Sequence, residues 1–280
     1  MSIVRTLRIL ASQRPSRPPS SLAAPARVAR HRHGQVPVTW IDEELAREAT
    51  IVHLHGGAYV AGESRAHWNW LEEVARRSGA AGAMVHYRLA PRHRFPVAVD
   101  DVLHAVDALV TGAVVRPGRW VLSGDSAGGG LALAVAQMLA GSGAGSPAAL
   151  LLESPWTDLR RRDGAVRATD HDEHGLRIAA ELYAGAFPRE DPRLSPILGD
   201  LAALPPVHLV NGSQDVLVEG SRALAAALEA AGTEHEYLEV PDAGHDVAVA
   251  GEGPAAQEAR RSQIVAIRRA TGRDRTPLNR

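Results

Sequence analysis

Three side chains that could together perform nucleophilic catalysis stand along the chain in the order serine, aspartate, histidine. The serine, Ser126, lies in the run Gly124-Asp125-Ser126-Ala127-Gly128. A Gly-x-Ser-x-Gly turn between a strand and a helix holds its serine in a strained conformation that exposes the hydroxyl, and small flanking residues let the turn close. The run therefore predicts a nucleophile elbow at Ser126. The alternative is a glycine-rich turn whose serine only caps the following helix.

A serine hydroxyl needs a base to become a nucleophile, and the base needs an acid that fixes its tautomer. His235 opens a strand-like run, whereas His245 lies in the Gly/Asp-rich loop after that run and is the better candidate for the base. Asp215 follows a predicted strand at the edge where side chains reach the crevice of a parallel sheet. The order Ser126, Asp215, His245 is the one that α/β-hydrolases use.

Acyl transfer places negative charge on one oxygen of the substrate, so the site must also offer hydrogen-bond donors at that point. The run His55-Gly56-Gly57-Ala58-Tyr59 follows the predicted strand 50–54. Its glycines allow backbone amides to approach a substrate without an intervening side chain. We therefore predict an oxyanion hole formed by the amides of Gly56, Gly57 and Ala127. The alternative for the glycine pair is an ordinary turn after an internal strand.

Short β-rich runs that alternate with Ala-rich helical stretches from residue 35 onward would position these residues. The alternation predicts an α/β fold with a mostly parallel central sheet and helices on both faces. The predicted strands are 36–41, 50–54, 82–86, 120–123, 148–153, 207–211 and 236–240. The predicted helices are 66–78, 96–111, 128–140, 218–231 and 257–270.

Two segments fall outside this alternation. Residues 1–40 contain no acidic residue but several arginines and prolines, and we expect an N-terminal arm or part of a lid there. Residues 41–280 would form the catalytic domain, with a charged, proline-containing lid insertion at about 160–203. The N-terminus has no apolar stretch of the length that a secretory signal needs, so we expect a cytoplasmic protein; the same composition also suits a transit peptide.

Composition narrows the classes of partner and cofactor. The chain has 280 residues with 31 basic and 32 acidic side chains, and this balance gives no overall attraction to nucleic acid or to an anionic bilayer. No segment approaches the roughly 18 consecutive apolar residues of a membrane helix. The chain has no cysteine, which excludes disulfides and Cys-ligated metals, and every basic residue is arginine, which excludes Schiff-base lysine chemistry and a P-loop.

Taken together, the motifs resemble the hormone-sensitive-lipase-like branch of the α/β-hydrolase esterases over about residues 50–248. The resemblance rests on the runs His55-Gly56-Gly57-Ala58-Tyr59, Tyr87-Arg88-Leu89-Ala90-Pro91, Phe95-Pro96, Asp100-Asp101, Gly124-Asp125-Ser126-Ala127-Gly128-Gly129, Ser154-Pro155-Trp156-Thr157-Asp158 and Gly244-His245. It implies the same triad and oxyanion hole, and a lid built from the N-terminus and the insertion at 160–203. Ala58 stands where many members have a third glycine, and the stretch before His55 is shorter than usual, which implies an incomplete lid and a more open pocket.

The residues and the resemblance lead to one main hypothesis, a serine carboxylic-ester hydrolase that acts on short-acyl esters through a covalent acyl-enzyme. Its partner would be a small-molecule ester, with no nucleic acid, no cofactor and no metal, and a homodimer is compatible with the sequence. Tyr59 and Trp156 are the candidate substrate-binding residues. The alternatives are hydrolysis of an acetylated natural product or a lactone, amide hydrolysis or acyl transfer to an alcohol, and a non-catalytic small-molecule receptor on the same fold.

Overall fold

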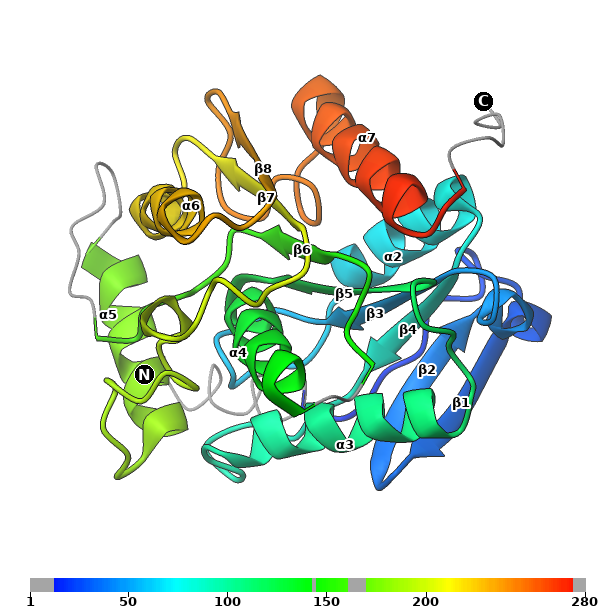
Figure 1. Ribbon diagram of the computed structural model, residues 1–280, viewed down its shortest axis with the longest axis horizontal. Helices are drawn as coiled ribbons and strands as arrows, with labels where there is room; N and C mark the ends of the chain where they lie inside the picture. The colour runs from blue at the N-terminus through cyan, green and yellow to red at the C-terminus, as the bar shows by residue number, and fades with distance from the viewer. Residues whose placement is uncertain (1–12, 143–144, 161–169, 274–280) are drawn as a thin grey trace.

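A single eight-stranded sheet organises the molecule, in the order β1-β2-β4-β3-β5-β6-β7-β8 (Figure 1). The computed structural model describes residues 13–142, 145–160 and 170–273. The strands are β1 (Val28–His33), β2 (Val36–Ile41), β3 (Thr50–Leu54), β4 (Ala81–Val85), β5 (Trp120–Asp125), β6 (Leu150–Glu153), β7 (Val207–Gly212) and β8 (His235–Val240). Strands β3 to β8 pair in parallel, whereas β2 is antiparallel to both β1 and β4. The predicted α/β fold with a mostly parallel sheet is confirmed.

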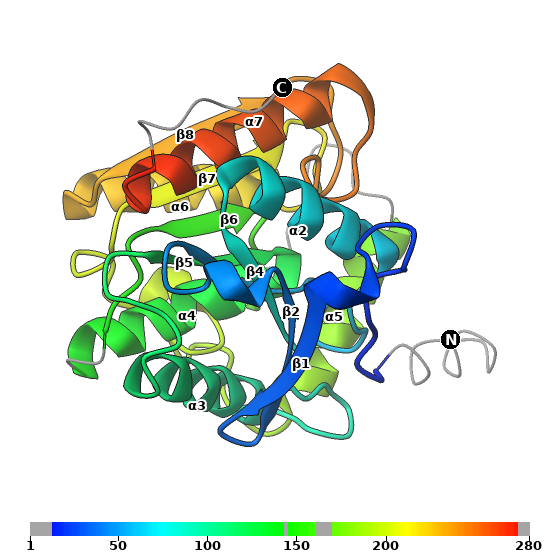
Figure 2. The ribbon, with the colours of Figure 1, turned by 90° about the vertical axis from the view of Figure 1, so that its right-hand side faces the viewer.

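Helices cover both faces of this sheet (Figure 2). They are α2 (Arg65–Ser78), α3 (Val97–Thr111), α4 (Ser126–Ser142), α5 (Asp170–Ala184), α6 (Val218–Ala231) and α7 (Gly253–Ala270). Helices α2 and α7 pack together over one face, and α3 and α4 pack together over the other. Short 3-10 turns occur at Pro25–Arg27, Glu43–Leu45 and Pro196–Leu198.

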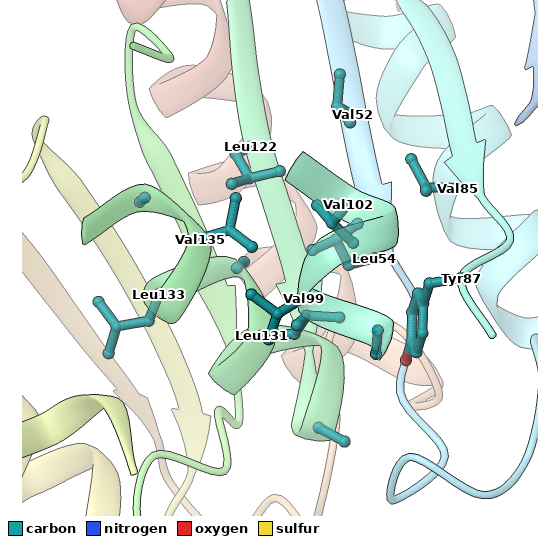
Figure 3. Packing of buried hydrophobic residues seen from close by; sticks show 14 of the residues in the cluster. Val52, Leu54, Val85, Tyr87, Val99, Val102, Leu122, Leu131, Leu133 and Val135 are labelled. Atoms are coloured by element: carbon teal, nitrogen blue, oxygen red, sulfur yellow. The ribbon is translucent and has the colours of Figure 1, made fainter. Parts of the chain in front are cut away.

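The central strands are buried on both faces because helices lie above and below them. Every residue of β3 and β4 is buried, which explains why these strands are mostly apolar and do not alternate between apolar and exposed polar residues. The face toward α3 and α4 is filled by branched aliphatic side chains, as Figure 3 shows for Val52, Leu54, Leu122, Val99, Val102, Leu131 and Val135. Strands β3 and β5 are paired in parallel, and the loops that follow them carry the predicted elbow and oxyanion hole.

The topology places a switch point at the carboxyl ends of those two strands. From β3 the chain passes through α2 to β4 on one side of the sheet, and from β5 it passes through α4 to β6 on the other side. Neighbouring connections that leave in opposite directions create the switch point at which α/β sheets bind their ligands. The loops after β7 and β8, which contain Asp215 and His245, reach the same edge of the sheet.

Two elements differ from the sequence-based expectation. The segment Val28–His33 is the edge strand β1, paired with β2, so residues 28–41 belong to the sheet and not to an N-terminal arm that ends at residue 40. Its side chains are half-buried or exposed, and an edge strand of this kind carries charged residues rather than an apolar pattern. Helix α5 lies within the expected insertion at 160–203, and its Ala180 and Tyr183 are buried in the core. The proposed lid role remains a prediction, and residues 1–12 and 161–169 lie outside the described part of the chain.

Residues 13–16 anchor the beginning of the described chain to the loop that follows β3. The side-chain amide of Gln13 donates to the backbone oxygen atoms of Val60 and Ala90, at 2.8 and 2.7 Å. The hydroxyl of Ser16 donates to the carboxylate of Glu63 at 2.7 Å, and the indole N–H of Trp68 donates back to that hydroxyl at 2.9 Å. Within the described residues, no helix is long and apolar enough to cross a membrane.

Candidate active site

Ser126 occupies the turn between β5 and α4 with a φ of 51°. Such a left-handed conformation is costly for any residue except glycine and persists only where the surrounding structure imposes it. Two glycines of the motif are required by close contacts: a Cβ on Gly124 would lie 2.2 Å from the backbone oxygen of Gly128, and a Cβ on Gly128 would lie 2.0 Å from that of Leu54. The predicted elbow geometry is therefore present at Ser126.

The imidazole of His245 lies between Ser126 and Asp215. Its Nε2 is 3.1 Å from Ser126 Oγ, and its Nδ1 is 2.9 Å from Asp215 Oδ1. Burial raises the pKa of Asp215, but the hydrogen bond and charge of His245 outweigh this effect and hold that pKa below its ordinary value. The three residues thus meet in an order that could move the serine proton to Nε2 while the ionised Asp215 holds the proton on Nδ1.

The loop that carries His245 approaches the end of β7 closely. A Cβ on Gly212 would lie 2.3 Å from the backbone oxygen of Ala243, so only glycine fits at the end of this strand. Beyond the histidine, the backbone N–H of Asp246 donates to the hydroxyl of Ser154 at 3.1 Å. These contacts hold the backbone just before and just after His245, and so limit where its imidazole can lie.

A buried carboxyl group at the end of β6 adds to this support. Glu153 accepts hydrogen bonds from the backbone N–H of Ala248 at 2.8 Å and from the side-chain amide of Gln263 at 2.9 Å. Burial raises the pKa of Glu153 well above its ordinary value. Glu153 therefore connects the loop after β8 to both the sheet and helix α7.

The loop His55-Gly56-Gly57-Ala58-Tyr59 after β3, called the oxyanion loop below for its expected role, differs in one donor from the sequence-based expectation. The N–H of Gly56 donates to Asp125 Oδ2 at 2.9 Å, so this amide is engaged and does not face a substrate. Gly57 has a φ of 116°, and a Cβ there would lie 2.4 Å from the backbone oxygen of Ala61. Within the described residues, the N–H groups of Gly57 and Ala58 meet no acceptor, and that of Ala127 lies in the first turn of α4, where amides have no intrahelical acceptor.

Comparison with known proteins decides the family. A family model described as alpha/beta hydrolase fold matches residues 51–249. This chain belongs to that family. An acetyl-hydrolase of Streptomyces hygroscopicus is 38% identical over 219 residues, which cover 76% of this chain and 72% of the relative.

Solved structures place this α/β-hydrolase beside bacterial esterases. A mutant of the esterase E40 matches it with a TM-score of 0.80 and 32% identity over 88% of this chain and 84% of that chain. An esterase from the bacterial hormone-sensitive lipase (HSL) family matches with a TM-score of 0.79 and 27% identity over 97% of this chain and 100% of that chain. The resemblance to hormone-sensitive-lipase-like proteins and the assignment to carboxylesterase-type hydrolases are confirmed.

In this α/β-hydrolase the oxyanion loop is held by a buried carboxylate that the sequence analysis did not include in the site. The side chain of Asp125 is fully buried; its Oδ2 lies 3.1 Å from His67 Nε2, and its Oδ1 lies 3.1 Å from His53 Nε2. For Asp125, burial raises the pKa, but the two histidines, led by the positive charge of His67, together lower it by more. For His67, burial lowers the pKa, but the negative charges around it, led by that of Asp125, together raise it by more. The net result is a lowered pKa for Asp125 and a raised pKa for His67, which makes them an ion pair. Burial lowers the pKa of His53, which stays neutral.

The two candidate substrate-binding residues occupy different environments. Trp156 lines a cavity of about 790 Å³ together with Leu217, which lies two residues after Asp215. Tyr59 is only 2% exposed, and its ring stacks on that of Tyr183 with the centroids 3.8 Å apart. With so little surface exposed, Tyr59 packs in the core against Tyr183 of α5, and its role in substrate binding stays a prediction.

Proposed function

We propose that this hydrolase cleaves carboxylic esters with a short acyl group, and that Ser126, His245 and Asp215 carry the reaction. Ser126 Oγ attacks the ester carbonyl while its proton passes to His245 Nε2. His245 then returns that proton to the departing alcohol, which leaves an acyl group on Ser126. A water molecule, activated by the same imidazole, hydrolyses the acyl-enzyme. The observation that carries the proposal is the position of the imidazole, 3.1 Å from the serine hydroxyl and 2.9 Å from the carboxylate.

The negative oxygen of the tetrahedral intermediate would be bound by the amides of Gly57, Ala58 and Ala127. These replace the set that includes Gly56, whose N–H donates to Asp125. Gly57 and Ala58 follow β3 and Ala127 follows β5, and the two strands are neighbours in the sheet. Loss of one such donor typically costs a factor of about 10² to 10³ in kcat.

Two observations support a short acyl group and a larger group on the other side of the ester. The Streptomyces hygroscopicus relative is named as an acetyl-hydrolase. The backbone N–H of Trp156 donates to the carbonyl oxygen of Ser126, and the cavity that Trp156 lines also presents charged residues such as Arg160 and Glu219, so a polar substituent larger than an acetyl group would fit there.

The test is the substitution Ser126→Ala assayed on p-nitrophenyl esters of increasing acyl length. We expect the wild-type enzyme to prefer acetate and butyrate over octanoate, and Ser126→Ala to lose activity by a factor on the order of 10⁴ or more. Ser262→Ala, a substitution of the same kind on α7, is the control and should retain wild-type activity. Full activity of Ser126→Ala would refute the assignment of the nucleophile. A folded wild-type protein that a fluorophosphonate probe fails to label would favour the non-catalytic receptor.

A further inference from the structure

A second carboxyl group contacts the reactive nitrogen of His245. The Oδ2 atom of Asp246 lies 3.2 Å from His245 Nε2, and Ser126 Oγ lies 3.1 Å from the same nitrogen. Asp246 has a φ of 54°, and this left-handed backbone lets its side chain lie alongside the preceding imidazole. Its other oxygen, Oδ1, is buried and has no hydrogen-bond partner within the described residues. Nε2 therefore faces two oxygen atoms, only one of which belongs to the nucleophile.

Charged groups from four other elements surround this pair. Burial is the largest cause that raises the pKa of Asp246, and the negative charges of Asp125 at the end of β5 and Asp215 after β7 add to it, while His245 and His67 on α2 lower it. Glu153 at the end of β6 also faces this group. For His245, burial lowers the pKa, but the charges of Asp246 and Asp215 outweigh burial and raise it. Both members of the pair thus hold a proton more strongly than usual.

We propose that Asp246 is a catalytic residue that shares one proton with His245 Nε2, and that this proton must leave before His245 can accept the proton of Ser126. With the proton on Nε2, the imidazolium donates to the Asp246 carboxylate and has no free electron pair. With the proton on Asp246, the carboxyl group donates to Nε2 and occupies that electron pair. Only after the proton passes to water is Nε2 neutral and free to accept. The inference rests on the triad of the proposed function.

The same carboxylate assists the reaction once it is ionised. When Nε2 accepts the proton of Ser126, the imidazole becomes positively charged next to two carboxylates, Asp215 and Asp246, instead of one. Asp246 therefore stabilises the charge that develops in the transition state and, at lower pH, also retains the proton that blocks the reaction. Removal of its charge should lower the activity plateau at high pH and extend activity to lower pH.

The experiment compares pH profiles of kcat/KM on p-nitrophenyl acetate for the wild-type enzyme and Asp246→Asn. Asparagine keeps the shape of the side chain and tolerates a left-handed backbone. We expect the acid limb to move to lower pH by about one unit, because two unit charges at this separation interact by about one pKa unit even in water. Relative to each enzyme's own plateau, Asp246→Asn would then be about tenfold more active on the acid side.

A matched control lies four residues earlier in the same loop. Asp242 has a φ of 55° and is exposed. Asp242→Asn therefore makes the same chemical change on a similar backbone without a contact to the imidazole, and its acid limb should coincide with that of the wild-type enzyme. If Asp246→Asn fails to fold by circular dichroism, Asp246→Gly removes the charge at a residue type suited to positive φ and should show the same shift.

A second readout isolates the base from later steps. The rate at which a fluorophosphonate labels Ser126 depends on the same proton transfer but not on deacylation, so its pH dependence should shift in Asp246→Asn by the same amount. An unshifted acid limb, or one moved to higher pH, would overturn the proposal for Asp246. The variant Ser126→Ala distinguishes an error about Asp246 from an error about the triad. If only the role of Asp246 is wrong, Ser126→Ala is inactive; if the proposed function is wrong, Ser126→Ala is as active as the wild-type enzyme.

Discussion

Substitution of Asp125 by asparagine tests whether a buried ion pair holds the oxyanion loop. The carboxylate accepts the N–H of Gly56 at 2.9 Å and lies 3.1 Å from Nε2 of His67. Asparagine keeps the shape of the side chain and one accepting oxygen, so what is lost is the negative charge and not the packing. The substitution therefore measures the value of the charge at this position.

The expected loss of stability follows from the two hydrogen bonds. A hydrogen bond to a charged group contributes about 1 kcal/mol more than a neutral one, so two of them give about 2 kcal/mol in the free energy of unfolding. The lowered pKa of Asp125 contributes stability that is present above its unfolded value, about 3.9, and is lost as the pH falls. The raised pKa of His67 contributes stability that is present below about 6.5 and is lost as the pH rises through its folded value. The difference between wild type and variant should therefore be largest between about pH 4 and 6.5 and smaller on both sides.

Urea unfolding at pH 3, 5.5 and 9 measures this difference, with Asp107→Asn on the exposed face of α3 as the control. Because Gly56 precedes the proposed donors Gly57 and Ala58, we also expect kcat on p-nitrophenyl acetate to fall about tenfold with little change in KM, since a displaced donor costs less than an absent one. A variant with wild-type kcat and an unfolding free energy within about 0.5 kcal/mol of wild type at pH 5.5 would refute the reasoning, because exposed substitutions already vary by that amount.

Two other substitutions address the backbone and the buried histidines. Gly128→Ala should destabilise the protein by more than about 3 kcal/mol in thermal unfolding, because the new Cβ would lie 2.0 Å from the backbone oxygen of Leu54, which cannot move aside as a side chain could. The control is Gly175→Ala on α5, where a Cβ would have nothing within 4 Å, and it should be neutral or slightly stabilising. His55→Gln should flatten the pH dependence of stability, because burial lowers the pKa of His55 to about 4 and the unfolded chain therefore binds more protons between that value and about 6.5. In urea unfolding, the wild-type protein should lose about 1.4 kcal/mol more per pH unit than His55→Gln as the pH falls through this window, and parallel slopes would contradict the assignment.

The parts of the site that the sequence predicts are those in which residue type and backbone geometry depend on each other. Glycine is required at 124 and 128 because a Cβ there would lie 2.2 and 2.0 Å from backbone oxygen atoms, so a glycine pattern around a serine specifies the turn. The buried strands β3 and β5 are recognisable because the apolar residues Ile51-Val52 and Trp120-Val121-Leu122 suit a sheet that is covered on both faces. The fold and the residues of the elbow could therefore be predicted.

What the sequence does not reveal is the direction in which a group points. Gly56 and Gly57 are identical in the sequence, but the N–H of Gly56 donates to Asp125 and that of Gly57 does not, and residue type alone cannot distinguish the two amides. Asp246 likewise reads as one more acid in a loop until its φ of 54° is known. The strand β1 escapes prediction for another reason: an edge strand lacks the apolar pattern by which buried strands are recognised.

The attachment of residues 13–16 sets a practical limit for anyone who re-engineers this enzyme. Trimming past Ser16 would strip the Glu63 carboxylate of two donors while Glu63 still lies 3.3 Å from His86 Nδ1 and 3.8 Å from His55 Nε2. His55 stacks on Tyr87 and immediately precedes the glycines of the oxyanion loop. Removal of residues 13–16 should therefore lower turnover through Glu63 and His55, although none of the removed residues belongs to the triad. Truncation libraries and affinity tags at this end should therefore keep residue 13 and everything after it, so that the contacts of Gln13 and Ser16 are preserved.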